Sequence, residues 1–288
     1  MYLVNFKMKI GAIIQARLSS SRFPRKVLKS LPYGSDTCVL QQVIRRVCKS
    51  NLIDEVIIAT TTSDDDEEIV DVANRENVGH FRGSLENVLE RYYLAAKEND
   101  IDVVVRITSD CPCADWGVID KVIKDHLDAG ADYTSNSLVE SFPRGIDCEV
   151  INFDVLEKCY LNASEKYEQE HVTPYIYKSH PEMFKINKYF EENDNSAIRI
   201  TLDTPQDYSL LCLIYEELYD EVDHFTLDDI LNLFNQKPWI KYINEEVIQK
   251  KVCKDLNEEL TEAANLCNIQ DLDRAKKFIN DYLEKNNG

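Results

Sequence analysis

Four cations and three consecutive serines fill the segment Gln15–Lys26 (QARLSSSRFPRK), which we call the serine loop. The apolar run before it, residues 10–14 (IGAII), predicts a buried strand, and the amphipathic pattern over residues 37–51 predicts a helix after it. Open α/β sheets bind ligands at the carboxyl ends of their strands, where this loop begins. Backbone amides and hydroxyls there donate hydrogen bonds to phosphates, while Arg and Lys neutralise their charge. The serine loop is therefore predicted to hold a polyphosphate.

A carboxylate follows another predicted strand, residues 102–108 (DVVVRIT). Asp110 falls just beyond its carboxyl end, and Cys111-Pro112 ends the strand because proline cannot donate a backbone hydrogen bond. A carboxylate at this edge is suited to hold a magnesium ion that bridges nucleotide phosphates. The alternative is an aspartate that caps the following turn.

A second aspartate stands in a similar position. Residues 198–203 (IRITLD) alternate between apolar and polar side chains and predict a strand that ends at Asp203. A helix over residues 206–218 follows, with Pro205 in its first turn. Taken alone, Asp203 is better explained as the N-cap of that helix. Two aspartates at the ends of two strands can share one hard cation, so the pair predicts a Mg²⁺ site of Asp110 and Asp203.

Four further polar groups are candidates for a substrate pocket opposite the phosphates. They are Arg82-Gly83-Ser84 at a strand-to-helix junction, Ser135-Asn136-Ser137 after a strand, Phe142–Glu149 in a charged turn, and Glu170–Tyr175 on a helix. Each is a weak signal alone, and a single histidine on a helix, such as His171, is more often structural than catalytic.

Strands and helices alternate along most of the chain. Strands are predicted over residues 10–14, 55–61, 79–83, 102–108, 131–136, 147–152, 185–191 and 198–203, and helices over residues 37–51, 64–77, 85–100, 116–129, 155–177 and 206–218. This rhythm predicts an α/β fold with a mostly parallel sheet and helices on both faces. We assign it to a domain of residues 8–240, followed by a Glu/Lys/Asn-rich helical C-terminal appendage of residues 241–288.

The composition limits the kind of partner. The 288 residues are 44% hydrophobic, enough for a sizeable core, and the formal net charge is −19. That charge argues against nucleic acid or an anionic membrane surface as the main partner. It is uneven, because residues 1–50 carry ten basic residues and one acidic residue. We interpret this excess as the environment of the serine loop, against the alternative of randomly scattered surface charge.

The cysteines and the N-terminal segment favour a cytoplasmic protein. Nine cysteines at irregular spacings fit a reduced compartment, and no Cys/His cluster has the spacing of a zinc site. No apolar run reaches the roughly 20 residues that span a bilayer. Residues 1–9 are too short and too polar for the apolar region of a signal peptide. We expect the first seven residues to be disordered or to precede the true start.

Together, the segments resemble the cytidylyltransferase family of nucleotide-sugar enzymes, which includes CMP-KDO and CMP-N-acylneuraminate synthetases. The motifs that carry the resemblance are IIQARLSSSRFPRKVL, FRGSLENVLERYY, VVRITSDCP, SNS, FPRGIDCEV, EHVTPYIY and LDTPQDY. They occur in this order between about residues 9 and 218, and the likeness is strongest to the bacterial spore-coat polysaccharide biosynthesis F proteins and their archaeal relatives. The C-terminal appendage lies outside the motifs.

The resemblance implies a Rossmann-like nucleotidyltransferase fold and a set of site residues. The implied catalytic residues are Arg17, Lys26, Asp110 and Asp203, with Mg²⁺ on the two aspartates. The implied nucleotide-binding residues are Ala16, Arg17, Ser19, Arg22, Lys26, Arg82, Gly83, Ser84, Arg106 and Asp110. The implied acceptor-binding residues are Asn136, Arg144, Asp147, Glu149 and His171. Arg25 and Ser109 depart from the family pattern, which usually has glycine at both positions; at Arg25 this puts the tightness of the turn in question.

The implied activity is transfer of CMP from CTP to an acidic sugar, a nonulosonic acid or a KDO-like sugar, with release of pyrophosphate. It would serve the synthesis of surface polysaccharide or glycan, in a homodimer without a nucleic-acid or membrane partner. Three alternatives stay open. They are a nucleotidyltransferase with another base or a non-sugar acceptor, a glycosyltransferase that uses a nucleotide-sugar, and a non-catalytic scaffold that kept the fold.

Overall fold

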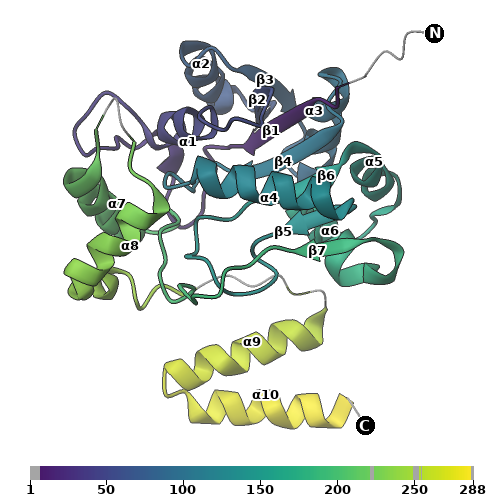
Figure 1. Ribbon diagram of the computed structural model, residues 1–288. Coiled ribbons are helices and arrows are strands. Elements are labelled where there is room, and N and C mark those ends of the chain that lie inside the picture. The colour runs from purple at the N-terminus through teal and green to yellow at the C-terminus, as the bar shows by residue number, and fades with distance from the viewer. Residues whose placement is uncertain (1–6, 221–223, 249–252, 254, 287–288) are drawn as a thin grey trace. The chain divides into compact units, whose positions relative to one another are not determined.

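A computed structural model describes residues 7–220, 224–248, 253 and 255–286 (Figure 1). The N-terminal residues that we expect to be disordered or to precede the true start lie, except for Lys7, outside the described residues. The chain divides into two compact units, Met1–Ser164 with Glu168–Val247, and Glu165–Tyr167 with Ile248–Gly288. Each helix of the described part is too short or too polar to cross a bilayer.

A seven-stranded sheet forms the centre of the first unit, in the order β3-β2-β1-β4-β6-β5-β7. Its strands are β1 (Ile10–Gln15), β2 (Glu55–Thr61), β3 (Gly79–Gly83), β4 (Val103–Thr108), β5 (Tyr133–Ser135), β6 (Glu149–Asn152) and β7 (Ile186–Lys188). Strands β3, β2, β1 and β4 run parallel, while β6 is antiparallel to both β4 and β5. The parallel half brings the carboxyl ends of β1 and β4 together, with Gln15 paired to Thr108.

Helices cover both faces of this sheet (Figure 1). They are α1 (Val39–Val47), α2 (Glu67–Arg75), α3 (Val88–Glu98), α4 (Trp116–Ala129), α5 (Phe153–Asn162), α6 (Lys166–His171), α7 (Pro205–Leu218) and α8 (Leu227–Gln236). Successive strand residues point to opposite faces. Ile14 packs in an apolar cluster with α1, α2, α4, α7 and α8, whereas Ile13 packs in a second cluster with α3 and α5. The predicted α/β architecture with helices on both faces is confirmed.

The strand predicted over residues 198–203 is wrong. This segment is extended but forms one isolated bridge, between Arg199 and Arg144. Its alternation is as predicted, since Ile200 and Leu202 are fully buried. Its backbone N–H groups donate to loops instead of a strand: Ile200 to the Arg144 carbonyl at 2.8 Å and Leu202 to the Asp110 carbonyl at 2.8 Å. The alternation of side chains in one segment does not show whether another strand pairs with it.

The single helix predicted over residues 155–177 is also wrong. The segment forms α5, α6 and a π-helical turn, η3 (Tyr175–Ser179). Helix α5 ends at Ala163, whose backbone is extended, and Val172 has a φ of +73°. Positive φ is incompatible with a continuous right-handed helix, and Pro174 lacks the N–H that would continue the ladder.

The second unit contains the helical appendage. Its helices are α9 (Leu256–Ile269) and α10 (Asp273–Asn286), which pack against each other. Asp255 caps α9 by accepting a hydrogen bond from the Glu258 N–H at 2.9 Å. The expected helical character of the C-terminal region is confirmed.

Candidate active site

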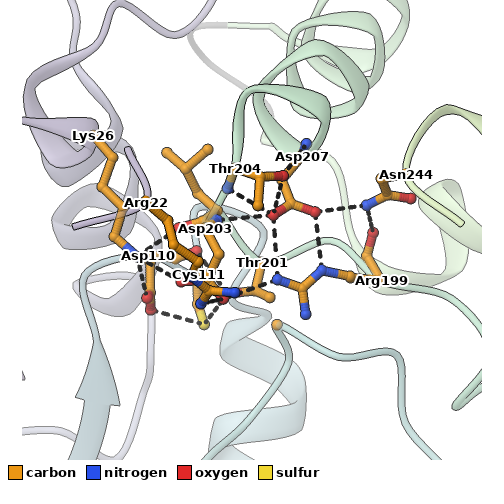
Figure 2. Close-up of polar contacts among 12 residues, drawn as sticks. Arg22, Lys26, Asp110, Cys111, Arg199, Thr201, Asp203, Thr204, Asp207 and Asn244 are labelled. Atoms are coloured by element: carbon orange, nitrogen blue, oxygen red, sulfur yellow. Dashed lines mark hydrogen bonds and ion pairs between the residues drawn. The ribbon is translucent and has the colours of Figure 1, made fainter. Parts of the chain in front are cut away.

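The Lys26 ammonium lies between the carboxylates of Asp110 and Asp203 (Figure 2). Its Nζ is 2.7 Å from Asp110 Oδ2 and 2.9 Å from Asp203 Oδ1, and it also donates to the Leu202 carbonyl at 2.6 Å. Burial alone would lower the pKa of Lys26, but the two carboxylates raise it above its ordinary value. The structure thus brings together one cation of the serine loop and both aspartates predicted to bind metal.

A left-handed residue directs Lys26 into this position. Arg25 has φ 56° and ψ 25°, and Lys26 then begins the short 3-10 helix η1 (Lys26–Leu28). Arginine therefore adopts the conformation for which glycine is favoured, at a cost of about 1–2 kcal/mol. Its side chain points outward and pairs with Glu68 at 2.6 Å. The departure from glycine leaves the turn itself in place.

Leu18 anchors the rest of the serine loop. Its N–H donates to Asp66 Oδ1 at 2.8 Å, and its carbonyl accepts from the N–H groups of Ser20 and Arg25. Asp66 is buried and also accepts from the Thr61 hydroxyl. The loop is therefore fixed at its middle, while the side chains of Arg17 and Ser19 are exposed.

Backbone contacts hold Asp110 against the segment that carries Asp203. The Asp110 carbonyl accepts from the Leu202 N–H at 2.8 Å and from the Thr201 hydroxyl at 3.2 Å. These two bonds join the end of β4 to the segment before α7. They explain how residues separated by more than ninety positions present their carboxylates to one ammonium.

Asp203 is not the N-cap of α7. Thr204 takes that role and forms a capping box with Asp207, so the Asp203 side chain is free to face cations. Its Oδ2 lies 3.0 Å from Arg22 and 2.8 Å from Arg199. Burial alone would raise the pKa of Asp203, but Lys26, Arg199 and Arg22 lower it to about 2.

The donor set fits a hard cation. Two carboxylates are a usual protein contribution to a magnesium site, with phosphate oxygens and water completing the shell. Both side chains are partly accessible, Asp110 at 25% and Asp203 at 16%. Within the described residues, no group of three or more His, Cys, Asp and Glu side chains is placed to hold a metal. Asp110 and Asp203 therefore suit a cation whose other ligands come from the nucleotide.

Arg82 ties the end of β3 to the end of β2, and Ser84 bonds the start of α3. Arg82 donates to the carbonyls of Thr61 at 3.0 Å and Ser63 at 2.8 Å, and its guanidinium also pairs with Glu67. Ser84 Oγ accepts from the Asn87 N–H at 3.1 Å, just before α3. These residues hold the edge of the sheet beside the serine loop.

Arg106 and Glu149 pair with each other inside the sheet. Glu149 Oε2 meets Arg106 Nη1, and Oε1 accepts from the hydroxyls of Tyr133 and Thr173. Burial would lower the pKa of Arg106, but Glu149 raises it above its ordinary range. Both side chains are largely buried, which places them in a structural network below the site.

Three of the predicted acceptor residues share one pocket. It is lined by Asn136, Ser137, Val139, Glu140, Ser141, Phe142, Arg144, Asp147 and Ser196. Asn136 is buried and its amide bonds the backbone of Ile146 and Cys148, both at 2.8 Å. Arg144 is exposed at the rim. Glu149 and His171 are not among the lining residues.

Sequence reasoning did not identify a network of polar residues that contacts Asp203. Arg199 Nε lies 2.9 Å from Asp207, and Asn244 bonds both Asp207 and the Arg199 carbonyl (Figure 2). The polar face of residues 198–203 already contained Arg199, so its alternation was a usable signal. Asn244 follows the 3-10 helix η5 (Pro238–Ile243), and its sequence surroundings carry no signal for this contact.

Known proteins are similar to this chain over most of its length. The sequence model of the cytidylyltransferase family matches residues 11–278, and so continues through α9 into α10, beyond the motifs that end near residue 218. An uncharacterized protein of Methanocaldococcus jannaschii is 41% identical over 84% of this chain and 97% of its own length. The spore coat polysaccharide biosynthesis protein SpsF of Bacillus subtilis is 32% identical over 78% of this chain and 94% of its own.

A solved structure is similar over most of the fold. A cytidylyltransferase from Leptospira borgpetersenii has a TM-score of 0.77 and 32% identity, covering 85% of this chain and all of that one. The family match spans nearly the whole chain, and the site combines a basic loop with two carboxylates at the sheet edge. The chain belongs to the cytidylyltransferase family and is a CTP-dependent cytidylyltransferase.

Proposed function

We propose that this enzyme transfers CMP from CTP to an acidic sugar and releases pyrophosphate, for the synthesis of a surface polysaccharide. The observation that carries the proposal is the contact of Lys26 with both Asp110 and Asp203. A cation that suits phosphate charge and two carboxylates that suit a metal lie together at one edge of the sheet, which supports the proposal. The similarity to a spore coat polysaccharide biosynthesis protein supports the polysaccharide role.

The serine loop binds the triphosphate in this proposal. Arg17 is exposed, and within the described part of the chain it forms no ion pair, so its charge is available to a phosphate. Lys26 and Arg22, from the same loop, both contact Asp203. The acceptor oxygen attacks the α-phosphorus in line, and these cations stabilise the negative charge that grows on the departing pyrophosphate.

Asp110 and Asp203 would hold the divalent cation, which we propose to be Mg²⁺. When bound, it supplies Lewis-acid stabilisation of phosphate oxygens. The chain contributes the rest: Arg199 and Arg22 keep Asp203 ionised, and the Leu202–Asp110 backbone bond keeps the two carboxylates side by side. The Lys26 ammonium contacts both carboxylates, so in this proposal it moves from them to the phosphates when the nucleotide binds.

Arg144 is the residue proposed to recognise the acceptor. It is exposed at the rim of a pocket that also contains Asn136 and Asp147. A guanidinium binds a carboxylate through two parallel hydrogen bonds, which suits an acid sugar. Asp147 lies close enough to influence this pairing, because the positive charge of Arg144 opposes the rise in the Asp147 pKa that burial causes.

Pyrophosphate release from a panel of substrates tests the proposal. The protein is incubated with Mg²⁺, each of CTP, UTP, ATP and GTP, and acidic or neutral sugars of matched ring size. We expect release with CTP and an acidic sugar, and a loss of about tenfold or more in kcat/KM for Arg144→Met with little change in kcat. Release with a neutral sugar at equal efficiency would contradict the acceptor assignment, and nucleoside diphosphate as product would indicate glycosyl transfer.

A further inference from the structure

Arg91 is a buried cation without a counter-ion. Its side chain lies on α3 and is only 2% exposed. Its Nε and Nη1 atoms are buried and have no hydrogen-bond partner among the residues that the structure describes. A buried charge is destabilising unless it is paired or hydrogen-bonded.

Arg46 shows how the same fold treats a buried arginine with a structural role. It is equally inaccessible, yet its Nε donates to the Ala114 carbonyl at 2.7 Å and its Nη2 to the Phe225 carbonyl at 2.8 Å. Its guanidinium also lies 4.4 Å above the Phe225 ring. Two of the three Arg46 nitrogens thus have carbonyl partners or lie by an aromatic ring, and only Nη1 is buried without a hydrogen-bond partner among the described residues. Arg91 receives no such hydrogen bonds from the described residues.

The surroundings of Arg91 belong to the nucleotide edge of the sheet. A Cβ added at Gly83, the last residue of β3, would stand 2.9 Å from the Arg91 Cγ, so the stem of Arg91 runs directly past that glycine. The charges that act on Arg91 include those of Arg17 and Asp66 in and beneath the serine loop. The side chain thus lies between the end of β3 and the start of the serine loop.

Asp66, the carboxylate whose charge acts on Arg91, already has other partners. Asp66 gives Oδ1 to the Leu18 N–H and Oδ2 to the Thr61 hydroxyl, and it forms no ion pair with Arg91. Burial lowers the pKa of Arg91, and the positive charge of Arg17 lowers it further. A like charge disfavours the charged form of Arg91, and an anion bound beside both arginines would favour it.

We propose that Arg91 and Arg17 together bind a phosphate group of the nucleotide, which makes Arg91 a further binding residue for the reaction. The inference rests on the proposed function, because it takes the serine loop as the triphosphate site. Nε and Nη1 are the sealed nitrogens, which leaves Nη2 to meet the anion. The enzyme accepts an uncompensated charge in the free state, and the bound phosphate compensates it.

This arrangement predicts opposite effects on stability and binding. Removing the Arg91 charge relieves the free protein of an unpaired buried cation but weakens the anion site. If Arg91 served only packing, its replacement would lower both the stability of the free protein and its affinity for the anion. Arg46→Met is the matched control, because it removes an equally buried guanidinium that does have partners.

The test measures Arg91→Met, Arg91→Lys and Arg46→Met in the full-length protein. Thermal unfolding without ligand reports stability, and isothermal titration at fixed Mg²⁺ reports the affinity for CTP, inorganic pyrophosphate and cytidine. We expect Arg91→Met to unfold at or above the temperature of the unaltered protein, while Arg46→Met unfolds below it. CTP and pyrophosphate should bind Arg91→Met about 10-fold to 100-fold more weakly, with cytidine unchanged.

Three outcomes would overturn the proposal. Arg91→Met that fails to fold, or unfolds at as low a temperature as Arg46→Met, would assign Arg91 a packing role. Pyrophosphate binding within twofold of normal in Arg91→Met and Arg91→Lys would show that Arg91 does not bind the anion. Weaker cytidine binding with normal pyrophosphate binding would move the contact to the nucleoside. Pyrophosphate binding needs no acceptor and no turnover, so failure of CMP transfer is a separate result.

Discussion

The Asp203 N–H donates a 2.9 Å hydrogen bond to the carboxylate of Asp207, one helical turn further along the chain. The Asp207 carboxylate also accepts a hydrogen bond from the Thr204 N–H. Asp207 therefore satisfies the backbone N–H groups at the start of α7. The Asp203 carboxylate is left for Lys26, Arg22 and Arg199. Two aspartates of the same motif, LDTPQD, thus have separate roles: one builds the helix start and the other faces the site.

The first prediction concerns the dependence of stability on pH. The pKa of Asp203 falls from 3.8 to about 2 on folding, so its ionised form stabilises the protein above about pH 4, and this contribution is lost as the pH falls through 2. Asp203→Asn should lower the free energy of unfolding by about 2 kcal/mol at pH 5 and by little near pH 2. Urea unfolding at both pH values measures the difference. A deficit that stays constant between pH 5 and pH 2 would show that Asp203 is not held ionised by these cations.

The second prediction concerns the left-handed turn at Arg25. Glycine there removes the conformational cost and gives up only an exposed ion pair with Glu68, which solvent and salt screen. Arg25→Gly should keep its activity and unfold within about 1 kcal/mol of the unaltered protein. Arg25→Val should be less stable than Arg25→Gly by at least about 1 kcal/mol, because a β-branched residue resists positive φ. Equal stabilities of the two variants in chemical denaturation would contradict the left-handed assignment.

The third prediction concerns Gly83. A methyl group there would stand 2.8 Å from Phe81 and 2.9 Å from Arg91, too close without movement of β3 or α3. Gly83→Ala should lower the free energy of unfolding by about 1–3 kcal/mol and weaken CTP binding as Arg91 is displaced. Gly34→Ala is a useful comparison, since nothing lies within 4 Å of the added carbon, although its φ of +77° adds backbone strain. CTP affinity should fall in the first variant and stay normal in the second.

The fourth prediction separates structure from substrate binding at Glu149. Its carboxylate is shared by Arg106, Tyr133 and Thr173 inside the sheet. Glu149→Gln leaves the Arg106 charge without its partner and should cost about 3–5 kcal/mol of stability. Calorimetry measures this loss, and the KM for the acceptor should change little at temperatures where the variant is folded. A stable variant with a raised acceptor KM would assign Glu149 to the acceptor pocket after all.

Local patterns predicted the elements better than their partners. Strands β2 and β3 and helix α4 have the predicted bounds, because period-two and helical patterns and the flanking turn residues all agree there. Residues 198–203 show the limit: their alternation buries Ile200 and Leu202 as predicted, but their hydrogen bonds go to the loops at Asp110 and Arg144. Pairing across such distances depends on the topology of the whole sheet.

The contacts of the candidate site were also predicted only in part. Lys26, Asp110 and Asp203 were candidates because their residue types, and the places of the two aspartates after predicted strands, fit phosphate and metal chemistry; the structure brings the three side chains into contact. The pairing of Arg106 with Glu149 was not predicted. It depends on antiparallel β6 lying beside β4, which puts Arg106 opposite Glu149. Nor did any pattern indicate that Arg91, inside an apparently ordinary amphipathic helix, would lie buried without a partner.

The central claim is that Asp110, Asp203 and Lys26 form the reacting centre for CMP transfer from CTP. Its most direct measurement is the turnover of Asp110→Asn and Asp203→Asn with Mg²⁺, CTP and an acidic sugar, followed by pyrophosphate release. Asp194→Asn, a change at an exposed turn, is the control. We predict that kcat falls about 100-fold or more in both site variants while the control keeps its activity. Near-normal turnover in either site variant, with the fold verified by circular dichroism, would contradict the claim.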